Sequence, residues 1–70
     1  MTNPSPRKLP IGTLVARVEA PTVLHRVTST IGPRDIVRIL PYRRSGAEHV
    51  LMRIGGTWCG NGSAWIVVQP

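Results

Sequence analysis

Few side chains in this sequence could carry out chemistry. It has one cysteine, two histidines and three acidic residues, namely Cys59, His25, His49, Glu19, Asp35 and Glu48. No two of them stand at a recognised metal-ligand spacing, and a structural zinc ion needs four ligands. No nucleophile signature surrounds Cys59, and no glycine-rich stretch leads into a helix as a phosphate loop would. The sequence therefore predicts no enzyme, no metal site and no cofactor.

The abundant chemistry is that of arginine. Nine basic residues, eight of them Arg, stand against three acidic residues and give a formal net charge of +6. A guanidinium makes planar, bidentate contacts to phosphate and can stack on bases, and a positive field raises the local concentration of polyanions. The alternative explanation is the coding bias of a GC-rich genome. In general look the chain is similar to small basic proteins of actinobacteria and their phages, but no motif here transfers a residue role from them.

The elements that must position these arginines are short β-rich runs separated by turn residues, beginning at Thr13. Residues 1–10 contain three prolines together with Arg7 and Lys8, and they predict a disordered basic arm. Residues 11–70 then form a single small β domain. The expected fold is mainly β, either a five-stranded SH3-like barrel or a β-meander. A meander would leave an exposed strand edge, so a homodimer is a further expectation.

The clearest local signal is the pair Asn61-Gly62, because both residues tolerate the positive φ of a two-residue type I′ turn. A hairpin centred there places Gly60 opposite Ser63 and Trp58 opposite Trp65. The two indoles are expected to anchor a small core. Trp58, beside the glycine-rich turn, could instead be a platform on which a base stacks.

A second hairpin is predicted with its turn at Ser45-Gly46. This register sets Leu40 opposite Leu51 and Arg38 opposite Arg53. One face is then wholly apolar and is expected to be the core side; it carries Val37, Ile39, Val50, Met52 and Ile54. The preceding segment, residues 33–40, could also be a helix that begins at Pro33, but its β-branched residues favour a strand.

The other face of that hairpin mixes arginines with an aromatic ring and an imidazole. Directly opposed arginines repel one another, so either this register is wrong or an anion binds between them. We therefore expect a nucleic-acid-binding module, or alternatively a module that binds an acidic protein surface through an edge strand or a patch of Leu40, Leu51 and Tyr42. The candidate binding residues are Arg17, Arg26, Arg38, Tyr42, Arg43, Arg44, His49, Arg53 and Trp58. His25, between Val23 and Val27 on one strand face, is expected to be a semi-buried structural residue.

The remaining expectations concern location. A lone cysteine forms no internal disulfide, which suits a reducing compartment. No apolar run approaches the roughly 20 residues of a membrane span, and no apolar stretch follows the basic N-terminus. The sequence therefore predicts a cytoplasmic protein without a membrane partner.

Overall fold

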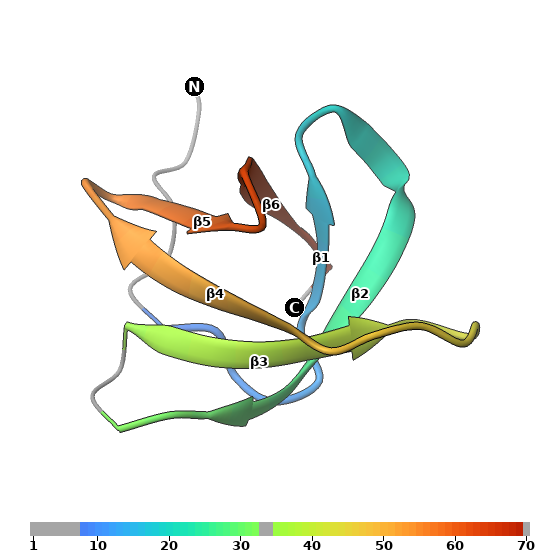
Figure 1. The fold of residues 1–70 in the computed structure, drawn as a ribbon, viewed down its shortest axis with the longest axis horizontal. Helices are drawn as coiled ribbons and strands as arrows, with labels where there is room; N and C mark the ends of the chain where they lie inside the picture. The colour runs from blue at the N-terminus through green and yellow to red at the C-terminus, as the bar shows by residue number, and fades with distance from the viewer. Residues whose placement is uncertain (1–7, 33–34, 70) are drawn as a thin grey trace.

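The computed structural model describes residues 8–32 and 35–69, which form one closed antiparallel barrel with its strands in sequence order (Figure 1). Each strand pairs with the strands before and after it, and the last strand pairs with the first. The six strands are β1 (Leu14–Arg17), β2 (Ala20–Thr30), β3 (Ile36–Pro41), β4 (His49–Ile54), β5 (Thr57–Gly60) and β6 (Ser63–Gln69).

The predicted all-β class and small barrel are confirmed, with six strands rather than five. Two of them, β1 and β5, have only four residues each and are close to the lower limit for a strand. The ambiguous segment is a strand from Ile36, as favoured from the sequence, while residues 33–34 lie outside the described part. Over residues 8–32 and 35–69, no helix is long and apolar enough to cross a membrane.

The barrel interior is filled by large apolar side chains, and one position beside it has room for glycine alone. Trp58 and Trp65 are both almost fully buried and lie directly opposite each other on β5 and β6. The Trp65 indole nitrogen donates a hydrogen bond of 2.9 Å to the carbonyl oxygen of Gly60. A Cβ atom at Gly60 would lie 2.5 Å from the carbonyl oxygen of Val50, so only glycine fits there. The remaining buried apolar cluster comprises Leu9, Val15, Val27, Val37, Ile39 and Leu51.

The hairpin at Asn61-Gly62 has the predicted register. Trp58 pairs with Trp65, Cys59 with Ala64, and Gly60 with Ser63. Asn61 and Gly62 have φ of 53° and 78°, as a type I′ turn requires. The register of this hairpin could be predicted because a two-residue loop made of two strong turn residues permits only one pairing of its strands.

The register predicted for the middle hairpin is wrong. Val37 pairs with Leu51 and Arg38 with Val50, so β4 is shifted by an odd number of residues from the prediction. Such a shift exchanges the two faces of a strand. Leu51 is fully buried while Val50 is 46% exposed, and Met52 and Ile54 also face outward. The prediction that Val37 and Ile39 face the core is confirmed. The prediction that Val50, Met52 and Ile54 face the core with them is wrong, because these side chains face the solvent.

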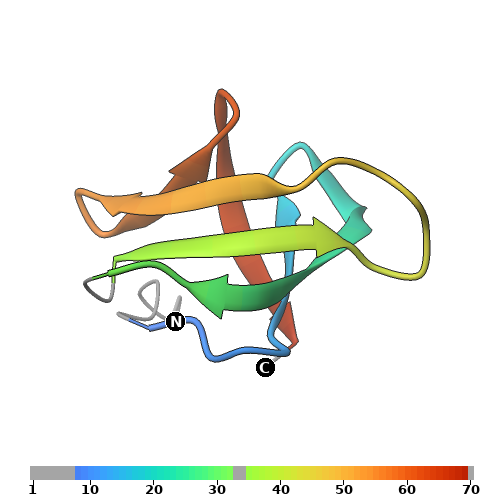
Figure 2. The same ribbon diagram turned by 60° about the horizontal axis from the view of Figure 1, so that its bottom comes forward.

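The reason lies in the connection between β3 and β4, which is a long loop over residues 42–48 and not a tight turn at Ser45-Gly46. The backbone N–H of Tyr42 donates to the carbonyl oxygen of Leu24 on β2, and Arg43 adopts a positive φ of 60°. The chain therefore leaves the β3–β4 ladder and turns toward β2. Figure 2 shows this loop projecting from one end of the barrel.

The packed domain begins before the predicted boundary at residue 11. Leu9 is only 2% exposed and belongs to the core cluster. The next residues are held against β2, where Gly12 donates to the carbonyl oxygen of Val27 and Val27 donates to that of Thr13. Figure 2 shows this segment running beneath the barrel. Residues 1–7 of the predicted arm, including Arg7, lie outside the described residues.

The observed register of β4 and the register expected from the sequence predict opposite effects on stability for substitutions at residues 50 and 51. Leu51→Ala should lower the free energy of unfolding by about 2–5 kcal/mol, because it leaves a cavity in the core. Val50→Ala, its exposed neighbour, should cost no more than about 1 kcal/mol. Urea denaturation followed by tryptophan fluorescence measures both, and a larger loss for Val50→Ala would restore the register expected from the sequence.

Candidate nucleic-acid interface

Three of the predicted binding residues meet in a hollow on the outside of β2 and β3. Arg26 and Thr28 of β2 lie beside the end of β3, since Arg26 pairs with Leu40. The guanidinium of Arg43 stands over the ring of Tyr42, 5.2 Å from its centroid. The hollow has a volume of about 370 Å³, and we call it the basic hollow; it is lined by Arg26, Thr28, Leu40, Pro41, Tyr42 and Arg43.

A second hollow of about 400 Å³ adjoins it across Tyr42 and Arg43. Arg44 and the start of β2 form its far wall, with Thr22, Val23 and Leu24. Arg44 is fixed there because its Nη1 donates a 2.9 Å hydrogen bond to the carbonyl oxygen of Leu24. The lining residues of the two hollows thus include three guanidiniums and a phenol, and no acidic side chain.

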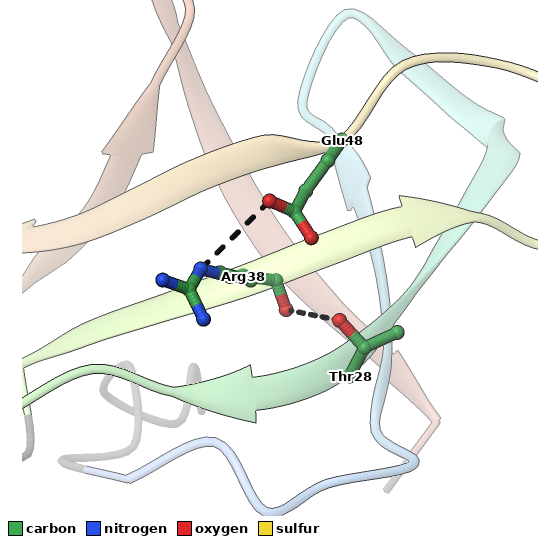
Figure 3. Close-up of polar contacts among 3 residues, drawn as sticks. All are labelled: Thr28, Arg38 and Glu48. Atoms are coloured by element: carbon green, nitrogen blue, oxygen red, sulfur yellow. Dashed lines mark hydrogen bonds and ion pairs between the residues drawn. The ribbon is translucent and has the colours of Figure 1, made fainter.

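Arg38 lies on the same outer face but is paired. Its Nε lies 3.8 Å from a carboxylate oxygen of Glu48, and both side chains are about half exposed (Figure 3). The hydroxyl of Thr28 donates to the carbonyl oxygen of Arg38 at 3.3 Å, which ties β2 to β3 at this point. An exposed ion pair of this kind contributes little to stability.

Two predicted site residues do not join this surface. Trp58 is buried in the core, so it is no exposed stacking platform. Arg53 pairs with Trp58 and not with Arg38, and no hydrogen-bond partner for its buried Nε lies in the described part of the chain. The opposed arginines that suggested an anion between β3 and β4 therefore do not exist. Three arginines, Arg26, Arg43 and Arg44, gather instead between β2 and the loop after β3.

The remaining two predicted residues, Arg17 and His49, belong to a group at the end of the barrel beside the loop. The ring of His25 lies edge-on to Trp65 with centroids 5.0 Å apart, and 5.5 Å from the ring of His49. The guanidinium of Arg17 stands over Trp65, 5.3 Å from the ring centroid. We call these residues the end cluster, together with Arg44, whose contact to His25 completes it.

The contact between Arg44 and His25 is a stack. Nη2 of Arg44 lies 3.5 Å from Nδ1 and 3.4 Å from Nε2 of the imidazole. Nearly equal distances to both ring nitrogens place the guanidinium nitrogen over the ring and not in line with one lone pair. Arg44 therefore belongs both to the second hollow and to the end cluster.

The electrostatics of the end cluster disfavour a further positive charge. His25 is 5% exposed, and burial lowers the pKa of its imidazole below the ordinary 6.5, assisted by the charges of Arg44, His49 and Arg17. A hydrogen bond between the imidazole and the backbone of Val23 opposes this shift only in part. In addition, the Nε of Arg17 is buried and has no hydrogen-bond partner among the described residues. Such a site favours a neutral His25 unless an anion is present.

His25 and Trp65 were not expected to be members of a site. His25 was predicted to be a semi-buried structural residue, and it is indeed buried. Its neighbours, however, come from β1, β4, β6 and the loop after β3, which was not foreseen. The available signal was that His25 shares a strand face with Val27, which points it inward. Its meeting with His49 could not be foreseen, because the wrong register turned His49 outward.

A separate apolar surface covers the outside of β4 and β5. A shallow hollow of about 470 Å³ lies here; its lining residues are Val50, Met52, Ile54, Cys59, Gly60, Gly62 and Ser63. Val50, Met52 and Ile54 are each at least two-fifths exposed. None of the lining side chains is charged. The predicted patch of Leu40, Leu51 and Tyr42 does not form, because Leu51 is in the core.

Within the described ranges, no three His, Cys, Asp or Glu side chains come close enough together to hold a metal ion. Comparisons with protein families, with curated proteins and with solved structures gave no match. Function must therefore be inferred from the surfaces described above.

The lowered pKa of His25 predicts how stability depends on pH. Because the folded pKa lies below the unfolded value, the unfolded chain takes up a proton first as the pH falls. The free energy of unfolding should therefore decrease as the pH falls through 6.5 toward the folded pKa of His25. His25→Phe keeps a planar ring without a titrating nitrogen and should make this decrease smaller. Urea denaturation in chloride buffers at about pH 7.5 and about pH 5.5 measures the difference. An equal decrease in both proteins would contradict the assignment.

Proposed function

We propose that this protein binds nucleic acid through the basic hollow and the second hollow beside it. The observation that carries the proposal is the convergence of Arg26, Arg43 and Arg44 around Tyr42 without an acidic side chain in either lining. Guanidiniums contact phosphates, and an aromatic ring offers a stacking surface to any base. A cytoplasmic location, where nucleic acid is accessible, is part of the same proposal.

Two further features support a single strand as the ligand. The hollows are shallow and lie along the outside of β2, so a chain of nucleotides could follow them without entering a deep cleft. The half-buried Tyr42 stands at their junction, where an unstacked base could lie against it. Sequence-tolerant binding of this kind depends on charge and stacking more than on base-edge hydrogen bonds.

Binding should weaken steeply with salt, and Arg26→Ala should change that dependence. For a single-stranded oligonucleotide of about 12 bases, log Kd against log salt should flatten by about 0.7 for each phosphate that the variant no longer neutralises. Arg26→Lys keeps the charge and should keep the slope. Tyr42→Ala should weaken single-strand binding by roughly 1–3 kcal/mol with the slope unchanged. Fluorescence anisotropy over a range of salt concentrations measures all of these.

Lys8→Ala is the control, because Lys8 is an exposed cation that lines neither hollow. It should alter affinity and slope less than Arg26→Ala does. The proposal is wrong if binding to single- and double-stranded oligonucleotides stays weaker than about 10⁻⁴ M at physiological salt.

The apolar surface on β4 and β5 supports a second candidate function, which is docking on a protein. This surface exposes three large apolar side chains, those of Val50, Met52 and Ile54, and none of the residues that line the hollow is charged. Such a surface is typical of the core of a protein interface. The partner we propose has an apolar patch rimmed by carboxylates, because the net charge of +6 attracts such a surface and repels a second copy. Closure of the barrel pairs every strand on both sides, so docking by an added edge strand loses its basis.

Met52→Glu tests this second candidate, since it places a charge in the centre of the apolar surface. A stoichiometric partner captured after nuclease treatment should be lost with Met52→Glu and retained with Arg43→Ala. Light scattering checks for a second copy in the same samples. A concentration-dependent dimer that Met52→Glu disrupts, or a partner insensitive to Met52→Glu, would contradict this assignment of the surface.

A further inference from the structure

The end cluster gathers positive and potentially positive groups from four parts of the chain. Arg17 comes from β1, His25 from β2, Arg44 from the loop after β3 and His49 from β4, all around the ring of Trp65 on β6. Packing such groups together costs stability unless a negative charge compensates. A local arrangement that disfavours folding in this way is often retained for function.

The three acidic side chains supply little of that compensation. Glu48 pairs with Arg38 on the outer face, and Asp35 is exposed near Arg53, at the other end of β4. Glu19 accepts a 2.6 Å hydrogen bond from the hydroxyl of Ser63. That hydrogen bond is the largest influence lowering the pKa of Glu19, and the charge of Arg17 is the smallest. The end cluster therefore has several donors and only a weak interaction with an internal anion.

The donors suit a tetrahedral dianion. Within residues 8–32 and 35–69, Arg17 has a buried Nε without an acceptor, and one of the Arg44 nitrogens donates to a backbone carbonyl. The rings of His25 and His49 lie 5.5 Å apart, and a protonated imidazole offers a second N–H donor beside the guanidiniums. Guanidinium and imidazolium groups form short, charge-assisted hydrogen bonds to phosphate oxygens.

The position of Arg44 links this cluster to the nucleic-acid surface. Arg44 forms the wall of the second hollow and also stacks on His25. A strand that followed the hollows toward Arg44 would arrive with its end at the end cluster. At that end a phosphate monoester carries up to two negative charges, whereas each internal phosphate carries one.

We propose that the end cluster binds a phosphate monoester dianion, supplied by the terminal phosphate of a nucleic-acid strand that lies in the basic hollow. This inference rests on the proposed function for the identity of its ligand. The charged and titratable groups that face His25 are Arg17, Arg44 and His49. A bound dianion offsets their repulsion, so binding raises the proton affinity of His25 and draws a proton onto the imidazole.

The first experiment compares oligonucleotides that differ only in a terminal phosphate. A strand with a 5′ or 3′ phosphate should bind about tenfold more tightly than the same strand with hydroxyl ends. His49→Gln, which alters the end cluster and lines neither hollow, should reduce this ratio toward one. Arg26→Ala should weaken both strands equally and preserve the ratio.

The second experiment uses free anions and so does not depend on nucleic-acid binding. Sulfate stays doubly charged across the titration range of histidine, and inorganic phosphate serves as the second probe. NMR of the imidazole C–H signals should show the pKa of His25 rising as sulfate replaces chloride at constant ionic strength. Arg44→Gln should reduce that rise, while Arg26→Ala should not.

The outcomes separate the two proposals. A sulfate-dependent rise in the pKa of His25 together with a terminal-phosphate preference supports both the site and its ligand. A rise in the pKa without any oligonucleotide binding overturns the proposed function and assigns the dianion site to a small free phosphate. Oligonucleotide binding that shows neither terminal preference nor a response of His25 to sulfate overturns this inference and leaves the proposed function intact.

Discussion

The opposed indoles of Trp58 and Trp65 are the constraint on which the rest of this structure depends. A barrel of six short strands has a narrow interior that side chains must fill, and the two indoles are the largest of the buried side chains. Trp65 is held by its hydrogen bond to the carbonyl of Gly60, where the backbone approaches β4 too closely for any side chain. The same fixed ring then presents one surface to Arg17 and another to His25, which is how the core comes to organise the end cluster.

How far the sequence predicted this fold depended on the turn that joined each pair of strands. Asn61-Gly62 admits one tight turn, so the pairing of the last hairpin could be derived residue by residue. Ser45-Gly46 carries a weaker signal, and both faces of β4 contain apolar residues, so the pattern could not decide between them. The deciding contacts were non-local, namely the hydrogen bond from Tyr42 to Leu24 and the positive φ of Arg43. No periodicity within β3 or β4 reports on either.

The same limit applied to the candidate site. The types of residue were foreseen, since Arg26, Tyr42, Arg43 and Arg44 were all expected to contact a ligand, and the structure brings them together. Their arrangement was not foreseen, because it arises from the packing of the β3–β4 loop against β2. Arg38 and Arg53, from which the expectation of an anion began, lie apart. The neighbours of His25 come from four other parts of the barrel, which a search along the sequence cannot assemble.

The burial of Leu9 has a practical consequence for anyone shortening this protein. Composition suggests a cut after Pro10, where the prolines and basic residues of the N-terminal segment end. Such a cut would remove a core side chain and leave the floor of the barrel uncovered beneath Val27. A trimmed version that keeps Leu9 retains this side chain in the core cluster.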